Sequence, residues 1–162
     1  MPANAPIPAF DPLSIAISGT NLIEASAGTG KTYGIAALFT RLVVLEQMPV
    51  ESILTVTFTK AATAELKTRL RARLDEVLQA LESVEDTDNL SDDLETYCRD
   101  NHPGDVFLTG LLKQALAQES RARLIVRLKA AIGQFDNATI YTIHGFCQRI
   151  LRDYAFLCHA PM

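Results

Sequence analysis

The residues with the clearest chemical potential form one glycine-rich segment near the start of the chain. In order, they are Ala25, Ser26, Ala27, Gly28, Thr29, Gly30, Lys31 and Thr32. This run matches the phosphate-binding pattern GxxxxGK[ST] except at its first position, where Ala25 replaces glycine. Gly28 and Gly30 allow the backbone to curl so that consecutive N–H groups point at phosphate oxygens. We therefore expect residues 25–32 to bind a nucleotide.

Two residues of this segment would make the contacts that matter most for nucleotide chemistry. Lys31 would place a positive charge on the β and γ phosphates of ATP, and Thr32 would ligate Mg²⁺ through its hydroxyl. The alternative is a glycine-rich turn with an incidental exposed lysine. The flanking sequence favours the phosphate site, because the apolar residues 21–25 predict a buried strand before the turn and a helix follows it.

The rest of the chain predicts the elements that must hold this segment in place. The first helix should continue to near Met48, and its predicted buried face carries Ile35, Leu38, Leu42 and Leu45. Residues 52–58 are nearly all apolar and predict a parallel strand covered on both faces. A second helix follows, with one stripe made of Leu66, Leu70, Leu74, Leu78 and Leu81. Further helices are expected over 106–117 and 120–132, a strand over 138–142, and an amphipathic helix over 146–157.

These elements predict the α/β class: a P-loop NTPase of RecA-like type, with a parallel sheet and a helical insertion at about 84–136. Three strands make an unusually small sheet, so we expect it to be incomplete.

A second segment of interest contains Thr57, Phe58, Thr59 and Lys60, where the predicted second strand runs into a helix. Ligand sites of open α/β sheets lie at such strand ends. The hydroxyls and the lysine could hold sugar-phosphate oxygens, and Phe58 could stack on a base. From residue types alone, a threonine-capped helix start with Phe58 in the core is the simpler interpretation.

A third segment contains Thr142, His144, Gly145 and Phe146, just beyond the last predicted strand. His144 could donate to a phosphate and Phe146 could stack on a base, although a lone histidine near a helix start is more often a surface or capping residue. The basic stripe formed by Lys67, Arg69, Arg71 and Arg73 is expected to be the solvated face opposite the leucines, although it could lie along a phosphate backbone.

Taken in order, the three segments resemble motifs I, Ia and Ib of the superfamily-one helicases of the UvrD/Rep type. That family uses AxAGTGKT, VTFTxxAAxE and TxHGF, which correspond here to stretches within residues 22–32, 56–71 and 142–151. Ala25 is the family's usual residue. The resemblance is strongest to the branch that forms the beta subunit of exodeoxyribonuclease V, which shares the Phe10-Asp11-Pro12-Leu13 start and a long helical stretch before the third motif.

This resemblance implies that residues 1–162 are the N-terminal part of helicase motor domain 1A, which binds ATP and Mg²⁺ through residues 25–32. It places the second and third segments along single-stranded DNA. It further implies ATP-driven 3′-to-5′ translocation by a subunit that also carries an exonuclease. Such a subunit works with gamma and alpha subunits on duplex ends, in double-strand-break repair and recombination.

Several parts of such an enzyme are missing from this sequence. No acidic pair follows a buried strand after the third motif, and the arginine finger, the nuclease carboxylates and the upstream adenine-reading glutamine are also absent. We therefore expect a chain that stops partway through the first motor domain and does not hydrolyse ATP or unwind DNA alone. One alternative is a complete, non-catalytic nucleotide-binding module that regulates a partner. Another is a small P-loop kinase, which would need a cluster of lid arginines.

Composition sets broader limits. A chain of 162 residues, 48% of them hydrophobic, can form one ordinary core. The net charge of −4 arises because eight of the 19 acidic residues lie within 82–100, a stretch interpreted as a solvated linker or exposed helix face. Cys98, Cys147 and Cys158 show no metal-ligand or disulfide spacing. With no membrane-length apolar run and no signal peptide, we expect a cytoplasmic bacterial protein without membrane partners.

Overall fold

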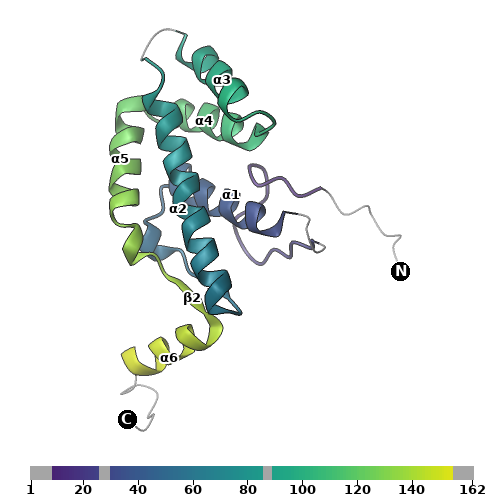
Figure 1. The fold of residues 1–162 in the computed structure, drawn as a ribbon, viewed down its shortest axis with the longest axis vertical. Coiled ribbons are helices and arrows are strands. Elements are labelled where there is room, and N and C mark those ends of the chain that lie inside the picture. The colour runs from purple at the N-terminus through teal and green to yellow at the C-terminus, as the bar shows by residue number, and fades with distance from the viewer. Residues whose placement is uncertain (1–8, 26–29, 86–88, 155–162) are drawn as a thin grey trace, which may run out of the picture.

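The computed structural model describes residues 9–25, 30–85 and 89–154, and it is organised around one long helix (Figure 1). This helix, α2 (Lys60–Glu82), packs against α1 (Lys31–Val44) and α5 (Arg121–Gly133). At one end lie α3 (Leu90–Asn101) and α4 (Val106–Gln118). At the other end lie the strands β1 (Thr55–Thr57) and β2 (Ile140–Thr142), followed by α6 (Ile143–Asp153). The α/β class is confirmed, in a mostly helical form.

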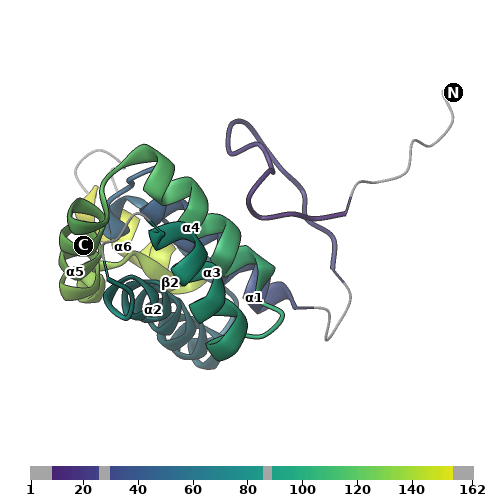
Figure 2. The same cartoon turned by 90° about the horizontal axis from the view of Figure 1, so that it is seen from above.

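The leucine stripe of α2 forms the centre of the core as predicted. Leu66, Leu70, Leu74 and Leu81 are buried, and Leu78 is partly buried against the same core. Seen from above, the other helices gather around one side of α2 (Figure 2). Full burial of one such leucine contributes about 2 kcal/mol, so this stripe accounts for much of the stability that holds α2 in place.

The helix after the glycine-rich turn is confirmed, but its predicted buried face is only partly right: Leu45 is buried and Leu42 packs against the core. Ile35 is 43% exposed, whereas Phe39 and Val43 are buried in the core. The sequence of α1 is apolar around most of its circumference, so spacing alone does not select the face. Contacts with α2, α4 and α5 make that selection and turn Phe39 toward Phe135, where the two rings meet edge to face.

The two strands form a parallel pair with Thr55 opposite Ile140 and Thr57 opposite Thr142. Each strand is shorter than predicted. The expectation that the first is covered on both faces is wrong, because Val56 is 41% exposed. Two short 3-10 helices, Val50–Ser52 and Phe135–Asn137, lead into the strands.

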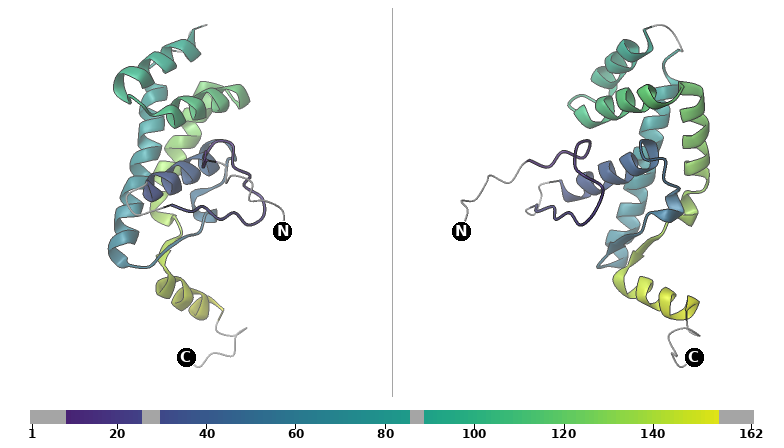
Figure 3. Two further views of the ribbon diagram at one scale, coloured as in Figure 1. Left: turned by 90° about the vertical axis from the view of Figure 1, so that its right-hand side faces the viewer. Right: turned by 180° about the vertical axis from the view of Figure 1, so that it is seen from behind.

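The predicted buried strand over residues 21–25 is also wrong. Residues 21–25 have no regular secondary structure, and Leu22 is 84% exposed. Figure 3 shows this N-terminal segment, in purple, running as an irregular loop beside α1. A strand needs a neighbour to satisfy its backbone N–H and C=O groups, and the part of the chain that the structure describes pairs none with this segment. Within the described residues, two strands therefore form where three were predicted.

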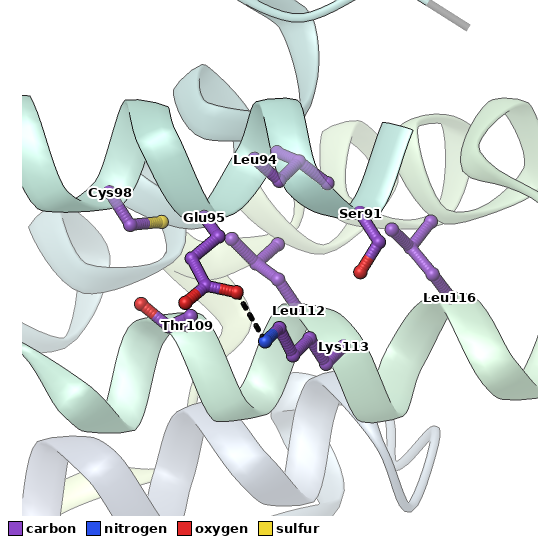
Figure 4. A pocket seen from close by; sticks show the side chains of 8 residues that line it. All are labelled: Ser91, Leu94, Glu95, Cys98, Thr109, Leu112, Lys113 and Leu116. Carbon is purple, nitrogen blue, oxygen red and sulfur yellow. Dashed lines mark hydrogen bonds and ion pairs between the residues drawn. The ribbon is translucent and has the colours of Figure 1, made fainter. Parts of the chain in front are cut away.

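The stretch predicted as a helical insertion contains the two predicted helices, α4 and α5, and a further helix, α3, within the acidic stretch. Asp92 and Asp93 lie in the first turn of α3, where negative charge stabilises a helix. Its outer face is solvated, as expected, but Leu94 and Cys98 are buried against α4. Figure 4 shows this seam, with Lys113 2.5 Å from Glu95 across it. The seam leaves no room for even a water molecule, so it is a packing surface.

Arg73 departs from the predicted solvated stripe, because it is only 8% exposed. Its Nη1 atom lies 2.5 Å from Asp105 Oδ2 and 2.6 Å from Glu76 Oε2. The guanidinium also lies over the rings of Phe107 and Tyr33, at 5.3 and 5.7 Å from their centroids. A buried arginine is tolerated only when it is paired in this way.

Asp105 is the residue that extends this arrangement to three helices. Its side chain accepts a hydrogen bond from the Leu108 N–H as the N-cap of α4 and another, of 3.1 Å, from the Tyr33 hydroxyl of α1. Burial opposes ionisation of Asp105, but hydrogen bonds from Arg73 and the Leu108 N–H outweigh it and lower the pKa of the carboxyl. Burial and the nearby Asp105 charge raise the pKa of Tyr33.

We predict that Asp105→Asn lowers the free energy of unfolding by about 3 kcal/mol at pH 7, because it removes one partner of a largely buried ion pair while an asparagine can still cap α4. Since the pKa of Asp105 is lowered in the folded state, its contribution is present above the unfolded value of about 4 and is lost as the pH falls through the folded value. Urea unfolding followed by circular dichroism at pH 7 and pH 3 measures both effects.

Glu95→Gln serves as the control, because its ion pair with Lys113 is exposed. A difference between wild type and Asp105→Asn that stays constant across this pH range would contradict the prediction.

Candidate functional site

The described end of the glycine-rich segment is the N-terminus of a helix. Gly30 has a φ of 83°, in the left-handed region, and α1 begins at the next residue. Among the described residues, no side chain caps this end and no acidic residue lies in the first turn. Lys31 is exposed and Thr32 is half-buried. The segment's remaining central residues, Ser26, Ala27, Gly28 and Thr29, lie outside the described residues.

A hollow of about 610 Å³ lies beside this helix start. Ala25, Gly30 and Lys31 line it together with Phe10 of the N-terminal loop and Gly34 of α1. A Cβ atom on Gly34 would lie only 3.0 Å from the Phe10 ring, so glycine permits the close approach of the loop. In the sequence analysis, Phe10 was noted only as part of a stretch that resembles a family. Its role beside the hollow was not predicted.

The loop is tied to α1 by Arg41, another residue that sequence reasoning missed. Its Nη1 atom donates to the carbonyl oxygens of Pro12, at 3.1 Å, and Ile15, at 2.8 Å. The only sequence signal for this contact was that Arg41 is the one basic residue of α1 after Lys31, in an otherwise apolar stretch. The effect is to hold one wall of the hollow close to Lys31.

The second and third segments lie together at the carboxyl ends of β1 and β2, where Thr57 is paired with Thr142. Thr59 caps α2 by accepting the Ala62 N–H, and Thr142 caps α6 by accepting the Gly145 N–H. These two threonines therefore have structural roles, as the simpler interpretation predicted for the second segment.

Phe58 does not follow that interpretation, because it is 86% exposed and lies outside the core. Lys60 and His144 are exposed as well, and Phe146 is half-buried, with its ring 6.5 Å from that of Tyr141. A Cβ atom on Gly145 would lie 3.1 Å from Thr142 Oγ1, so glycine keeps the cap of α6 intact. This edge thus presents an aromatic ring, a lysine and an imidazole to solvent.

The β1–β2 pairing thus brings the second and third segments together. Within the described part of the chain, no hydrogen bond or ion pair joins residues 30–32 to either segment. The same part of the chain contains no helix that is long and apolar enough to cross a membrane.

The sequence pattern of the UvrD/REP helicase N-terminal domain matches residues 11–160, and the chain belongs to this family.

Three individual relatives are all named as the same kind of subunit. The chain is 40% identical over 154 residues to the RecBCD enzyme subunit RecB of Haemophilus influenzae and 41% identical over 155 residues to that of Escherichia coli. Each match covers 91% of this chain but only 12% and 11% of the respective relative. RecB of Mycolicibacterium smegmatis is 38% identical over 133 residues, which cover 82% of this chain and 10% of that protein.

Gly30 offers a direct test of the turn geometry. We predict that Gly30→Ala lowers the free energy of unfolding by about 1–2 kcal/mol, because an L side chain is strained in the left-handed region. Gly133→Ala is the matched control: α5 ends there, nothing lies within 4 Å of an added Cβ, and φ is not positive, so stability should stay equal or rise by about 0.5 kcal/mol. Urea titrations of both variants measure the difference. Equal effects would show that the turn does not require glycine.

Proposed function

We propose that this chain is the ATP-binding first part of motor domain 1A of a RecB-type, ATP-dependent 3′-to-5′ DNA helicase and exonuclease subunit. In the complete protein it would act with gamma and alpha subunits on duplex ends, in double-strand-break repair and recombination. The observation that supports this most directly is the position of Lys31 and Thr32, which open α1 immediately after a left-handed Gly30. Family membership and the relatives named RecB support the choice of motor.

In this proposal, residues 25–32 form the P-loop of a RecA-like sheet in which β1 and β2 are two of the strands. The N–H groups at the start of α1 and the Lys31 ammonium would hold the β and γ phosphates of ATP. The Thr32 hydroxyl would hold Mg²⁺, which supplies charge neutralisation at those phosphates when bound. The helical insertion at about 84–136 lies between the segments that would contact DNA.

The paired ends of β1 and β2 would contact single-stranded DNA. Exposed Phe58 would stack on a base, while Lys60, His144 and the hydroxyls of Thr57, Thr59 and Thr142 would contact the sugar-phosphate backbone. Phe146, half-buried beside Tyr141, would complete this surface, with Gly145 beneath it. Because Phe58 is exposed, its ring is accessible to a base.

The proposal also includes a limit on activity. ATP hydrolysis needs a carboxylate to orient the metal and cations to stabilise the transition state, and the sequence contains no matching acidic pair after the third motif. The chain alone would therefore bind nucleotide without turning it over.

We predict that Lys31→Ala weakens binding of a fluorescent ATP analogue with Mg²⁺ at least tenfold, about 1.4 kcal/mol, because the phosphates lose a full positive charge. Lys129→Ala is the control, since that lysine lies on α5 and pairs with Glu82. Fluorescence titration gives both affinities. Equal affinities for wild type and Lys31→Ala would overturn the nucleotide site, and Lys31-dependent ATP hydrolysis by this chain would overturn the proposed limit on activity.

A second experiment tests the DNA surface. We predict that Phe58→Ala weakens binding of an oligothymidylate about tenfold, because stacking of one base on an aromatic ring contributes about 1–3 kcal/mol. Val126→Ala removes another highly exposed apolar side chain, on α5, and should leave the affinity unchanged. Fluorescence anisotropy measures both, and an equal weakening in the two variants would contradict the assignment of Phe58.

A further inference from the structure

A polar pocket of about 380 Å³ lies between the end of β2 and α6, next to the third segment. The residues that line it are Tyr141, Gly145, Gln148, Arg149, Arg152 and Asp153. Each of positions 145, 148, 149 and 152 lies three or four residues from two of the others, so the four share one face of α6. Most of the pocket lining therefore belongs to α6, the helix that Thr142 caps.

We propose that Arg149 and Arg152 form a binding site for backbone phosphates of single-stranded DNA, which extends the surface made by the second and third segments along α6. This inference rests on the proposed function, because it assumes that DNA lies at the β1–β2 edge. It adds two binding residues to the eight proposed above.

Arg149 is held in position before any ligand arrives. Its guanidinium lies over the Tyr141 ring, 5.3 Å from the centroid, and its Nη1 atom donates to the Tyr141 hydroxyl. Its Nε atom lies 3.3 Å from Asp153 Oδ2. About half of the Arg149 side chain remains exposed, so part of its planar donor fork is open to a ligand.

Arg152 supplies a second charge, one turn further along. It is exposed, and it forms no ion pair among the residues that the structure describes. The pocket thus holds two guanidinium groups against the single carboxylate of Asp153 and keeps one net positive charge. Guanidinium groups bind phosphate through two parallel N–H···O bonds, which a surface lysine does not reproduce.

The proposed DNA surface has fewer positive charges than the phosphates it would contact, and this pocket would supply two more. A single strand carries one negative charge per nucleotide, yet the eight DNA-contacting residues proposed above contain only one permanently charged base, Lys60. Three other arginines are less suitable: Arg69 pairs with Glu65, Arg99 lies next to Asp100, and Arg73 is buried. Arg149 and Arg152 are the cations on the helix that begins inside the third segment.

The salt dependence of DNA binding tests the proposal with a readout that a structural role would not change. The probe is a fluorescent oligothymidylate, and the proteins are the full chain, the double variant Arg149→Gln/Arg152→Gln, the single variant Arg152→Gln, and Arg123→Gln. Arg123 is exposed in the first turn of α5, which lies toward the α4 end of the molecule, away from α6 (Figure 1). Thermal unfolding confirms that each variant is folded.

We expect the slope of log affinity against log salt concentration to fall by about 0.7 for each phosphate that is no longer neutralised, so by about 1.4 in the double variant and 0.7 in Arg152→Gln. Arg123→Gln should keep the wild-type slope. Arg152→Gln alone decides the question if the double variant does not fold, because Arg152 is exposed and no ion pair is broken among the described residues.

Each remaining outcome is decisive. An unchanged slope in the arginine variants, together with weaker binding by Phe58→Ala, overturns this pocket and leaves the proposed DNA surface standing. Absence of oligothymidylate binding by the wild-type chain at low salt overturns both. Displacement of the probe by oligoglutamate as efficient as by unlabelled oligothymidylate shows a site for acidic peptides, and it also overturns the phosphate assignment.

Discussion

The interaction on which the arrangement of helices depends is the ion pair between Arg73 and Asp105. Arg73 belongs to the central helix α2, while Asp105 caps α4 and accepts a hydrogen bond from Tyr33 of α1. Transfer of both charges out of water is costly, so the pair is stable only when all three helices meet at this point. The Nε and Nη2 atoms of Arg73 have no hydrogen-bond partner in the described part of the chain, and the aromatic faces of Tyr33 and Phe107 partly compensate.

A second arginine holds the opposite end of α1. Arg127 of α5 donates to the carbonyl oxygens of Val43, at 2.5 Å, and Val44, at 2.7 Å, where the helix leaves such groups unpaired. Glu119 accepts from the same guanidinium and keeps it in place. Residues of α4 and α5 therefore fix α1 near its start, through Asp105 and Tyr33, and at its end, through Arg127. Because Lys31 and Thr32 are the first residues of α1, these contacts with α4 and α5 set the orientation of the proposed nucleotide site.

These long-range interactions explain what could be predicted from the sequence. The α2 stripe was predictable because leucines at helical spacing have one way to be buried, and the helix beginning at Lys31 followed from the glycine-lysine-threonine signal. The burial of Arg73 was not predictable, because its partner Asp105 lies far along the chain. Likewise, the strand predicted over 21–25 depends on a neighbour, not on its own apolar residues. For the proposed site, motif patterns identified the residues, but only the structure showed that Phe58 is exposed and that Arg149 is oriented by Tyr141.

The helix α6 presents two chemically different faces, and the difference bears on how it would work. Ile150, Leu151 and Tyr154 are exposed along one side, while Arg149 and Arg152 line the polar pocket on another. The relatives named RecB contain far more chain than the 10–12% that this sequence matches, so they have further polypeptide available to cover an apolar face. The basic face must stay open if it is to meet a phosphate backbone. Packing on one side would then hold the arginines on the other side at a fixed distance from the β1–β2 edge, as a strand-tracking surface requires.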